Sequence, residues 1–249
     1  MKLWEVIMSS IDALREMIKS SKRIVFLGGA GVSTESGIPD FRSENGIFDA
    51  IRKYGYPPET LLSRSFFDRH PDTFFEYYRS LLMSGDAKPN KAHYALAKLE
   101  QDGMLTAVAT QNIDGLHTIA GSKNVYELHG SIKRNHCMRC GRFYDDTFIS
   151  ESTGVPRCSC GGIVKPDVVL YEEGLDNDTL TGAVTHIMRA DMLIVGGTSL
   201  QVYPAAGLID YYRGEKLVLI NRSTTPYDRY ANLVINDSIG KVLGEVTGV

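Results

Sequence analysis

The chain has 249 residues, of which 43% are hydrophobic and 23% are charged, and its 27 basic and 30 acidic side chains give a net charge of −3. These proportions are those of a globular protein and exclude a largely disordered chain. The length suffices for one large domain, or for one domain with an insertion, and such a chain buries a core without disulfide bonds. The mild acidity gives no electrostatic reason to expect nucleic acid as a partner.

The sequence contains no run of about 20 apolar residues, so we expect no membrane-spanning helix and no membrane partner. Residues 3–19 carry apolar side chains near helical spacing and predict an amphipathic helix. Charged residues, among them Asp12, Arg15 and Glu16, interrupt this apolar pattern, whereas a secretory signal has an uninterrupted apolar centre. We therefore expect a cytoplasmic protein.

Short apolar, β-branched runs alternate with helical patterns along most of the chain. We predict strands at 23–27, 105–109, 125–128, 192–195, 217–220 and 233–235. Helical patterns lie at 91–102, 176–189, 204–212 and 238–246. Strands that alternate with helices indicate an α/β fold with a doubly wound, Rossmann-like parallel sheet.

Two stretches interrupt this alternation. Residues 40–90 are aromatic-rich and read as helical, and residues 131–165 contain all four cysteines. We predict that these two inserts together form a smaller domain, a helical module plus a cysteine ribbon. The Rossmann-like domain is then built from the remaining segments, 1–39, 91–130 and 166–249.

A glycine-rich turn, GGAGVST at 28–34, follows the first predicted strand. Glycines let a backbone turn tightly and approach a phosphate closely, so the turn is typical of a nucleotide site. It differs from the dehydrogenase fingerprint because Thr34 stands where a third Gly or Ala is required, and no acidic residue follows on a second strand. A tight turn without a ligand is the alternative.

Small or polar residues also follow the other predicted strands: TQNID at 110–114, HG at 129–130, GGTS at 196–199, and Asn221. Ligands of parallel sheets bind beyond the carboxyl ends of the strands. A structural loop needs only one capping residue, so this much polarity favours a site that holds a dinucleotide. Gly197, Thr198 and Ser199 would meet phosphate or ribose, and Asn221 would bond a ribose hydroxyl.

The cysteines have the spacing Cys137-x2-Cys140-x17-Cys158-x-Cys160. In a reducing compartment, two close pairs of thiolates favour a tetrahedral zinc site over disulfides. The second pair has one intervening residue where two are common. With no open coordination position, one zinc ion would stabilise the insert and take no part in catalysis. Four free thiols are the alternative.

Taken in order, these motifs resemble the sirtuins, the NAD-dependent protein-lysine deacylases. The resemblance covers residues 20–240 and rests on GAGVS, GIPDFR, TQNID, HG, the four-cysteine insert, GTSL and N-x-x-x-T-P. The short length and TPYD at 225–228 are similar to bacterial sirtuins of the undifferentiated type. The resemblance implies that NAD is a co-substrate. The acyl group then passes from lysine to ADP-ribose, with release of nicotinamide and O-acetyl-ADP-ribose.

The resemblance assigns three residues to catalysis. His129 matches the general base that activates a ribose hydroxyl, a task that suits imidazole near neutral pH. Asn112 and Asp114 match residues that orient the nicotinamide ribose and carboxamide, although capping of the next helix is an alternative for both. The NAD contacts that the resemblance implies are Ala30, Gly31, Ser33, Thr34, Phe41, Arg42, Gln111, Asn112, Ile113, Asp114, His129, Gly197, Thr198, Ser199 and Asn221.

The family binds its acyl-lysine peptide as a strand between two chain segments, here 168–174 and 201–204. The resemblance implies that Val169, Tyr171 and Val202 contact this substrate. Most relatives have Gly where this chain has Glu172, and a side chain there would alter the local turn or repel acidic peptides.

The sequence limits the acyl groups that we expect the protein to remove from lysine. Relatives that remove succinyl or malonyl groups carry a Tyr-x-x-Arg pair before the K-P-N stretch, and this sequence has none. We therefore expect acetyl or longer apolar acyl groups. Phe74, Phe75 and Tyr78 suggest an apolar channel, or are simply core residues.

Protein mono-ADP-ribosyl transfer is the alternative function, and the presence of His129 argues against it because that transfer needs no base for the ribose hydroxyl. A dehydrogenase is disfavoured by the glycine turn, and a non-catalytic NAD sensor or zinc scaffold by the intact Asn112, Asp114 and His129. We expect acyl-lysine proteins as partners, and nicotinamide as product and inhibitor.

Overall fold

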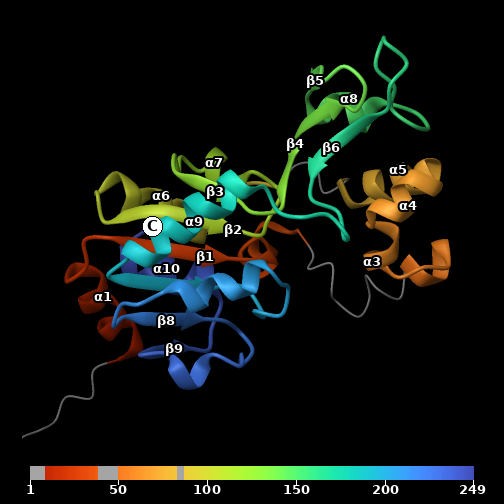
Figure 1. Ribbon diagram of the computed structural model, residues 1–249. Helices are drawn as coiled ribbons and strands as arrows, with labels where there is room; N and C mark the ends of the chain where they lie inside the picture. The colour runs from red at the N-terminus through yellow and green to blue at the C-terminus, as the bar shows by residue number, and fades with distance from the viewer. Residues whose placement is uncertain (1–8, 39–49, 83–86) are drawn as a thin grey trace, which may run out of the picture.

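The computed structural model describes residues 9–38, 50–82 and 87–249, which form a larger and a smaller lobe (Figure 1). The predicted NAD contacts Phe41 and Arg42 lie outside the described residues. None of the helices in these described ranges is both long and apolar enough to cross a membrane.

The larger lobe contains a six-stranded sheet in the order β3-β2-β1-β7-β8-β9, and every neighbouring pair is parallel. The six predicted strands are therefore confirmed. Their bounds are β1 (Ile24–Gly28), β2 (Leu105–Thr110), β3 (Val125–Glu127), β7 (Met192–Gly196), β8 (Leu217–Ile220) and β9 (Leu233–Ile235).

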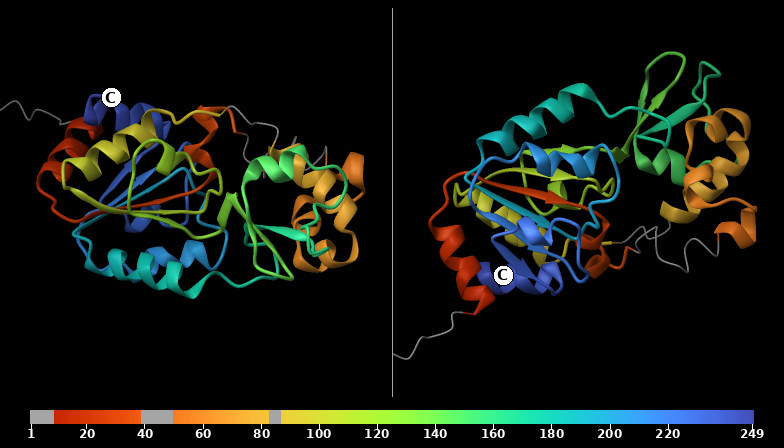
Figure 2. Two further views of the ribbon diagram at one scale, coloured as in Figure 1. Left: turned by 90° about the horizontal axis from the view of Figure 1, so that it is seen from above. Right: turned by 60° about the horizontal axis from the view of Figure 1, so that its bottom comes forward.

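Helices cover both faces of this sheet (Figure 2). Successive side chains of a strand point to opposite faces, so Ile24 and Phe26 of β1 enter one core while Val25 and Leu27 enter the other. The first core is closed by α1 (Ser10–Lys19), α6 (Lys91–Gln101) and α10 (Ile239–Thr247), and the second by α9 (Asn177–Arg189) and η3 (Ala205–Tyr211). Burial on both faces explains why the strands are almost wholly apolar.

The predicted helix at 204–212 is a 3₁₀ helix rather than an α-helix. Its backbone bonds include Gly207 N–H to the Pro204 carbonyl, which closes an i to i+3 turn. Gly207 weakens α-helical propensity, and the segment packs on the sheet through Ala205, Ala206, Leu208 and Ile209.

The smaller lobe combines a three-stranded antiparallel sheet, ordered β5-β4-β6, with a group of short helices. The strands are β5 (Phe143–Tyr144), β4 (Gly130–Cys137) and β6 (Val164–Val168). Its helices include α3 (Pro58–Leu61), α4 (Arg64–Arg69), α5 (Pro71–Leu82) and α8 (Asp146–Glu151). Both predicted inserts contribute to one shared apolar core, which includes Phe74 and Cys137. The exact domain boundaries stay predictions.

Phe74 and Phe75 belong to this core with no exposed surface, so they do not form an acyl channel. Edge-to-face contacts join Phe67, Phe74 and Phe75 within this core. Of the three aromatic residues suggested for the channel, Tyr78 alone lines the cavity described below.

The order of the strands fixes where a ligand site can form. From β1 the chain proceeds outward to β2 and β3, whereas from β7 it proceeds the other way to β8 and β9. Strands β1 and β7 lie side by side, with Gly28 opposite Gly196 at their carboxyl ends. This reversal is the switch point at which a crevice opens in sheets of this type.

Candidate functional site

The loops after β1 and β7 contact each other through glycines at the switch point. The Gly31 N–H donates to the Gly197 carbonyl at 2.8 Å. A Cβ atom on Gly31 would lie 2.7 Å from the Gly197 Cα, and Gly197 itself has a φ of +61°. These glycines therefore allow two strand-end loops to pack closely, a role in addition to the tight turn and the approach to phosphate that the sequence predicted.

Three predicted residues form a hydrogen-bonded group beside this contact. Ser33 Oγ donates to Asp114 Oδ2 at 2.7 Å, and Asn112 Nδ2 donates to Ser33 Oγ at 2.9 Å. The other carboxylate oxygen of Asp114 accepts the Leu116 N–H at 2.9 Å, at the start of α7 (Leu116–Ile119). Asp114 therefore bonds the first turn of the helix and Ser33 at once, and both bonds fix its orientation.

Gln111 connects the ends of three strands. Its N–H donates to the Gly28 carbonyl of β1 at 2.9 Å, and its Nε2 donates to Thr198 Oγ1, after β7, at 3.1 Å. Its carbonyl lies 3.0 Å from His129 Nδ1, two residues after β3. Because a carbonyl only accepts, Nδ1 carries the proton and the lone pair of the imidazole resides on Nε2.

Thr198 is held from its other side by Asn221. The Asn221 Oδ1 accepts the Thr198 N–H at 3.0 Å. Among the described residues nothing bonds the buried Asn221 Nδ2. Asn221 therefore positions Thr198, and its predicted contact with ribose stays a prediction.

A cavity of about 520 Å³ joins these groups and extends to the smaller lobe. Its described lining includes most predicted site residues: Ala30, Ser33, Gln111, Asn112, Ile113, Asp114, His129, Val169, Tyr171, Gly197, Thr198, Ser199 and Val202. The described lining does not include Gly31, Thr34 and Asn221. Thr34 Oγ1 donates to the Gly31 carbonyl at 3.0 Å, so it stabilises the turn. A cavity of this size, with convergent donors at a switch point, fits a dinucleotide.

Sequence reasoning missed Asn90, which lies at the N-cap of α6. Its Nδ2 donates to the Val32 carbonyl at 2.7 Å and to Ser36 Oγ at 2.9 Å, so it holds the loop after β1. Its Oδ1 accepts the Ala92 N–H at 2.9 Å. An Asn directly before a helical pattern signals a cap, but the link to Val32 has no local signal.

A buried pair of histidines lies beside Asp114. The rings of His93 and His117 have centroids 4.7 Å apart, and the side chains are 0% and 1% exposed. Burial lowers the pKa of His93 to about 4, against a smaller raising effect of Asp114. Burial and the neighbouring His93 lower the pKa of His117 to about 3. Both histidines are neutral at pH 7 and serve as core residues.

The four cysteines form one cluster in the smaller lobe, with all four sulfur atoms within 4.8 Å of one another. The Cys137–Cys160 and Cys140–Cys158 sulfurs are 3.5 and 3.6 Å apart, far beyond the length of about 2.05 Å of a disulfide. Tetrahedral zinc with Zn–S bonds of about 2.3 Å separates sulfurs by about 3.8 Å. The donor set therefore fits one structural zinc ion.

The pKa values of these thiols are also consistent with a site for a metal cation. The Cys160 N–H and the Tyr144 side chain lower the pKa of Cys158 to about 5. At Cys160 the Gly162 N–H lowers the pKa, but the sulfurs of Cys137 and Cys140 raise it, to about 11. Four sulfurs this close do not all ionise without a neutralising charge, which a divalent ion supplies.

Comparison with known proteins agrees with this geometry. A model of the Sir2 family matches residues 29–204. A curated "NAD-dependent protein deacetylase" of Clostridium perfringens is 63% identical, over 95% of this chain and 98% of that protein. A protein with the same description from Clostridium acetobutylicum is 60% identical, over 97% and 99% of the two chains.

Solved structures are similar over almost the whole chain. One described as "Sir2-p53 peptide-NAD+" has a TM-score of 0.85 and 39% identity, over 96% of this chain and 97% of that one. A Sir2 complex with an inhibitor, 2′-O-acetyl-ADP-ribose and a deacetylated p53 peptide has a TM-score of 0.83 and 38% identity, over 95% and 97%.

Proposed function

Because this chain belongs to the Sir2 family, we propose that it is an NAD-dependent protein-lysine deacetylase. It transfers the acyl group from lysine to the ADP-ribose of NAD, and releases nicotinamide and O-acetyl-ADP-ribose. The observation that carries the proposal is the convergence of His129 with the Ser33–Asn112–Asp114 group in one cavity at the switch point. The names of the relatives support the same reaction.

His129 acts as the general base. Its Nδ1 proton is held by the Gln111 carbonyl, so Nε2 is the atom that takes a proton from the ribose hydroxyl. When bound, NAD supplies the ribose that receives the acyl group. The bond to Gln111 fixes both the tautomer and the plane of the ring, which a general base requires.

Asn112 and Asp114 orient the nicotinamide end of NAD. Asp114 is fixed by Ser33 and by the Leu116 N–H, and Asn112 is fixed through the same Ser33 hydroxyl. Groups held in this way keep their geometry when the substrate binds, which lowers the entropic cost of catalysis. The roles of Phe41 in shielding the ribose and of Arg42 in binding a phosphate rest on the resemblance alone.

The protein substrate binds where Val169, Tyr171 and Val202 line the cavity. We propose acetyl-lysine, or lysine with a longer apolar acyl chain. Among the described lining residues Lys133 alone carries a positive charge, and it forms an ion pair with Asp146 at 2.6 Å. This charge pattern offers no clamp for a succinyl or malonyl carboxylate, which supports the apolar preference.

The test is incubation of the purified protein with NAD and an acetyl-lysine peptide, with products followed by mass spectrometry. We expect nicotinamide, deacetylated peptide and O-acetyl-ADP-ribose in equal amounts. His129→Ala should lower deacetylation by at least about a hundredfold, because general-base catalysis contributes on the order of 10²–10⁴. His70→Ala, which removes an exposed histidine outside the cavity lining, is the matched control.

Other outcomes would contradict the proposal. An ADP-ribosylated protein without deacetylation would favour the transferase. No turnover with acetyl, succinyl or myristoyl peptides would leave a binding role. Turnover of a succinyl peptide faster than an acetyl peptide would refute the apolar preference alone.

A further inference from the structure

The segment that follows β6 connects the catalytic residue to the helical part of the smaller lobe. The Val169 N–H donates to the His129 carbonyl at 2.9 Å. Two residues later, the Tyr171 N–H donates to the Leu62 carbonyl at 3.0 Å, and the Tyr171 carbonyl accepts the Arg64 N–H at 2.9 Å. The segment 168–171, which provides the predicted substrate contacts, therefore lies between His129 and the start of α4.

A tight turn ends this segment. The Glu173 N–H donates to the Leu170 carbonyl at 3.0 Å, and Glu172 has a φ of +75°. A positive φ at the third position of a four-residue turn favours glycine. This agrees with the Gly that the resemblance implies for most relatives at this position. A non-glycine residue in this conformation is strained, and it keeps the conformation only where contacts with its surroundings hold it there.

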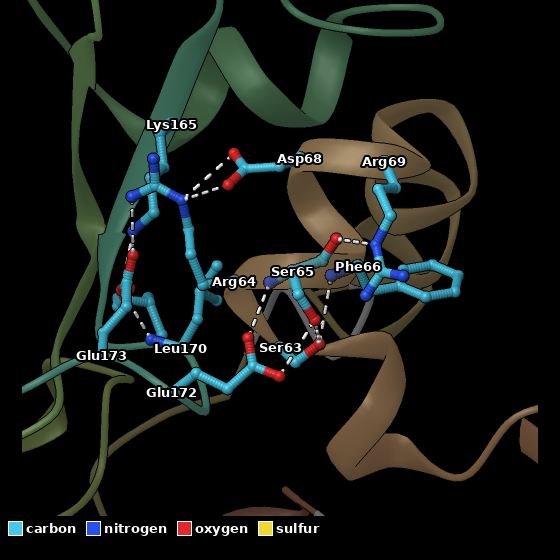
Figure 3. Close-up of polar contacts among 11 residues, drawn as sticks. Ser63, Arg64, Ser65, Phe66, Asp68, Arg69, Lys165, Leu170, Glu172 and Glu173 are labelled. Atoms are coloured by element: carbon cyan, nitrogen blue, oxygen red, sulfur yellow. Dashed lines mark hydrogen bonds and ion pairs between the residues drawn. The ribbon is translucent and has the colours of Figure 1, made fainter.

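The Glu172 carboxylate supplies such contacts (Figure 3). One oxygen accepts the Ser65 N–H at 2.9 Å and the other accepts the Ser65 hydroxyl at 2.9 Å. Ser65 lies in the first turn of α4, where backbone N–H groups have no partner within the helix. Glu172 therefore connects the turn to α4 through its side chain, although its backbone conformation favours glycine. We expected this side chain to alter the turn or to repel acidic peptides, and the structure shows its carboxylate bonded to Ser65.

Glu173 makes three further bonds beside it (Figure 3). Its carboxylate accepts the Leu170 N–H at 2.9 Å, Lys165 Nζ at 3.2 Å and Arg64 Nη1 at 3.2 Å. The side chains of Glu173 and Lys165 are only 19% and 16% exposed. Burial raises the pKa of Glu173, but the Leu170 N–H, Lys165 and Arg64 outweigh it and hold this pKa below its ordinary value. Glu173 is therefore ionised at neutral pH and joins the turn, β6 and α4.

We propose that Glu172 and Glu173 are positioning residues for the protein substrate: together they hold segment 168–171 against α4 in the geometry that receives the acyl-lysine peptide. The identity of that substrate rests on the proposed deacetylase function. The carboxylates contact residues 64, 65, 165 and 170, whereas the polar NAD-site groups lie on strand ends of the larger sheet. Their loss should therefore impair use of the peptide more than use of NAD.

Hydrogen–deuterium exchange of the zinc-loaded protein measures the positioning directly, without reference to activity. In Glu173→Ala we expect the Leu170 and Tyr171 amides to exchange about tenfold faster or more, since charge-assisted bonds are lost. The β1 amides should be unchanged. Glu173→Gln, which keeps the shape and removes the charge, should give an intermediate increase. Asp68→Ala is the matched control, because Asp68 also pairs with Arg64 but does not touch the segment.

Steady-state kinetics supply the second measurement. In Glu173→Ala we expect the KM for an acetyl-lysine peptide to rise about tenfold, while the KM for NAD and kcat stay within about twofold. Glu172→Gly removes the bonds to Ser65 but relieves the strained φ, so its peptide KM should rise less, by about two- to threefold. Ser65→Ala, which keeps Glu172, should lie between wild type and Glu172→Gly.

Unchanged exchange at Leu170 and Tyr171 in Glu173→Ala would overturn the proposal. An equal rise in the KM for NAD and for peptide would also overturn it, because a general loss of structure would then be the cause. A wild-type protein that fails to deacetylate any peptide would refute the proposed function instead. In that case the exchange data would still decide whether the two carboxylates hold the segment.

Discussion

The two lobes line one cavity but hold their side chains by different means. In the larger lobe the site residues follow strand ends, so the register of the parallel sheet brings Gly28, Gly196, Gln111 and His129 together. The smaller lobe has a three-stranded sheet and an apolar core, and side chains from segments distant in the sequence also meet there, namely four cysteines and the Glu172–Glu173 turn. The comparison teaches that the register of one parallel sheet gathers the site residues of the larger lobe, whereas the smaller lobe depends more on contacts between distant segments.

Metal removal should give the largest effect, and it should fall on the smaller lobe. Zinc binding contributes on the order of 10 kcal/mol in small zinc domains, so Cys140→Ser should lose the metal and the packing around Cys137 and Phe74. We expect deacetylation to be abolished while the sheet of the larger lobe stays folded. Metal analysis would measure the loss of zinc, and near-ultraviolet circular dichroism would measure the loss of packing. Far-ultraviolet circular dichroism would show whether the sheet of the larger lobe stays folded.

Met138→Ala is the matched control, because it changes an exposed residue of the same ribbon and leaves all four sulfurs. If Cys140→Ser unfolded both lobes together, the claim that they are separately organised would be wrong.

In the larger lobe, a substitution at the switch point should have the corresponding destabilising effect. In Gly197→Ala the new Cβ would lie 2.4 Å from the Val32 N, on a residue whose φ is +61°. Overpacking and the left-handed backbone together should lower the free energy of unfolding by about 3 kcal/mol. Urea denaturation would measure this loss, and the KM for NAD should rise more than the KM for peptide.

Gly174→Ala is the control, because a Cβ there meets no atom within 4 Å. An equal loss of stability in the two variants would show that the close contact of the strand-end loops is unimportant.

The buried histidines predict a smaller effect, on pH dependence. The pKa values of His93 and His117 are lowered to about 4 and about 3, so the unfolded chain binds protons first. The neutral rings make their full contribution to the free energy of unfolding above pH 6.5, and this contribution is lost as the pH falls toward the lowered pKa values. Well below pH 6.5, the free energy of unfolding should change by about 1.4 kcal/mol per pH unit for each histidine. Urea denaturation between pH 7.5 and 5.5 would measure it.

His93→Gln should flatten that slope, whereas the exposed His70→Gln should leave it unchanged. A slope that is equal in wild type and His93→Gln would contradict the assignment of neutral buried rings.

The sequence predicted the features that local pattern encodes. Apolar runs identified all six strands of the large sheet, and polar residues after the second strand identified Asn112 and Asp114. The family resemblance added Ser33, which the structure brings together with them. The spacing of the cysteines likewise identified the sulfur cluster.

Contacts between distant segments were not predictable in this way. Arg64 and Glu173 are 109 positions apart, and Asn90 and Val32 are 58 apart, so no periodicity links either pair. The 3₁₀ helix Ala205–Tyr211 was read as an ordinary helix because its apolar pattern does not distinguish the two hydrogen-bond schemes. Likewise, Phe74 and Phe75 looked equally suited to a channel or a core, and tertiary packing decided between them.

His129 has a mechanical consequence of its own. It stands between β3 of the larger lobe and β4 of the smaller lobe, and its backbone carbonyl holds Val169 while its imidazole is held by Gln111. Any displacement of one lobe relative to the other therefore acts on the proposed base through both its backbone and its ring, and Val169 is coupled to that displacement through the His129 carbonyl.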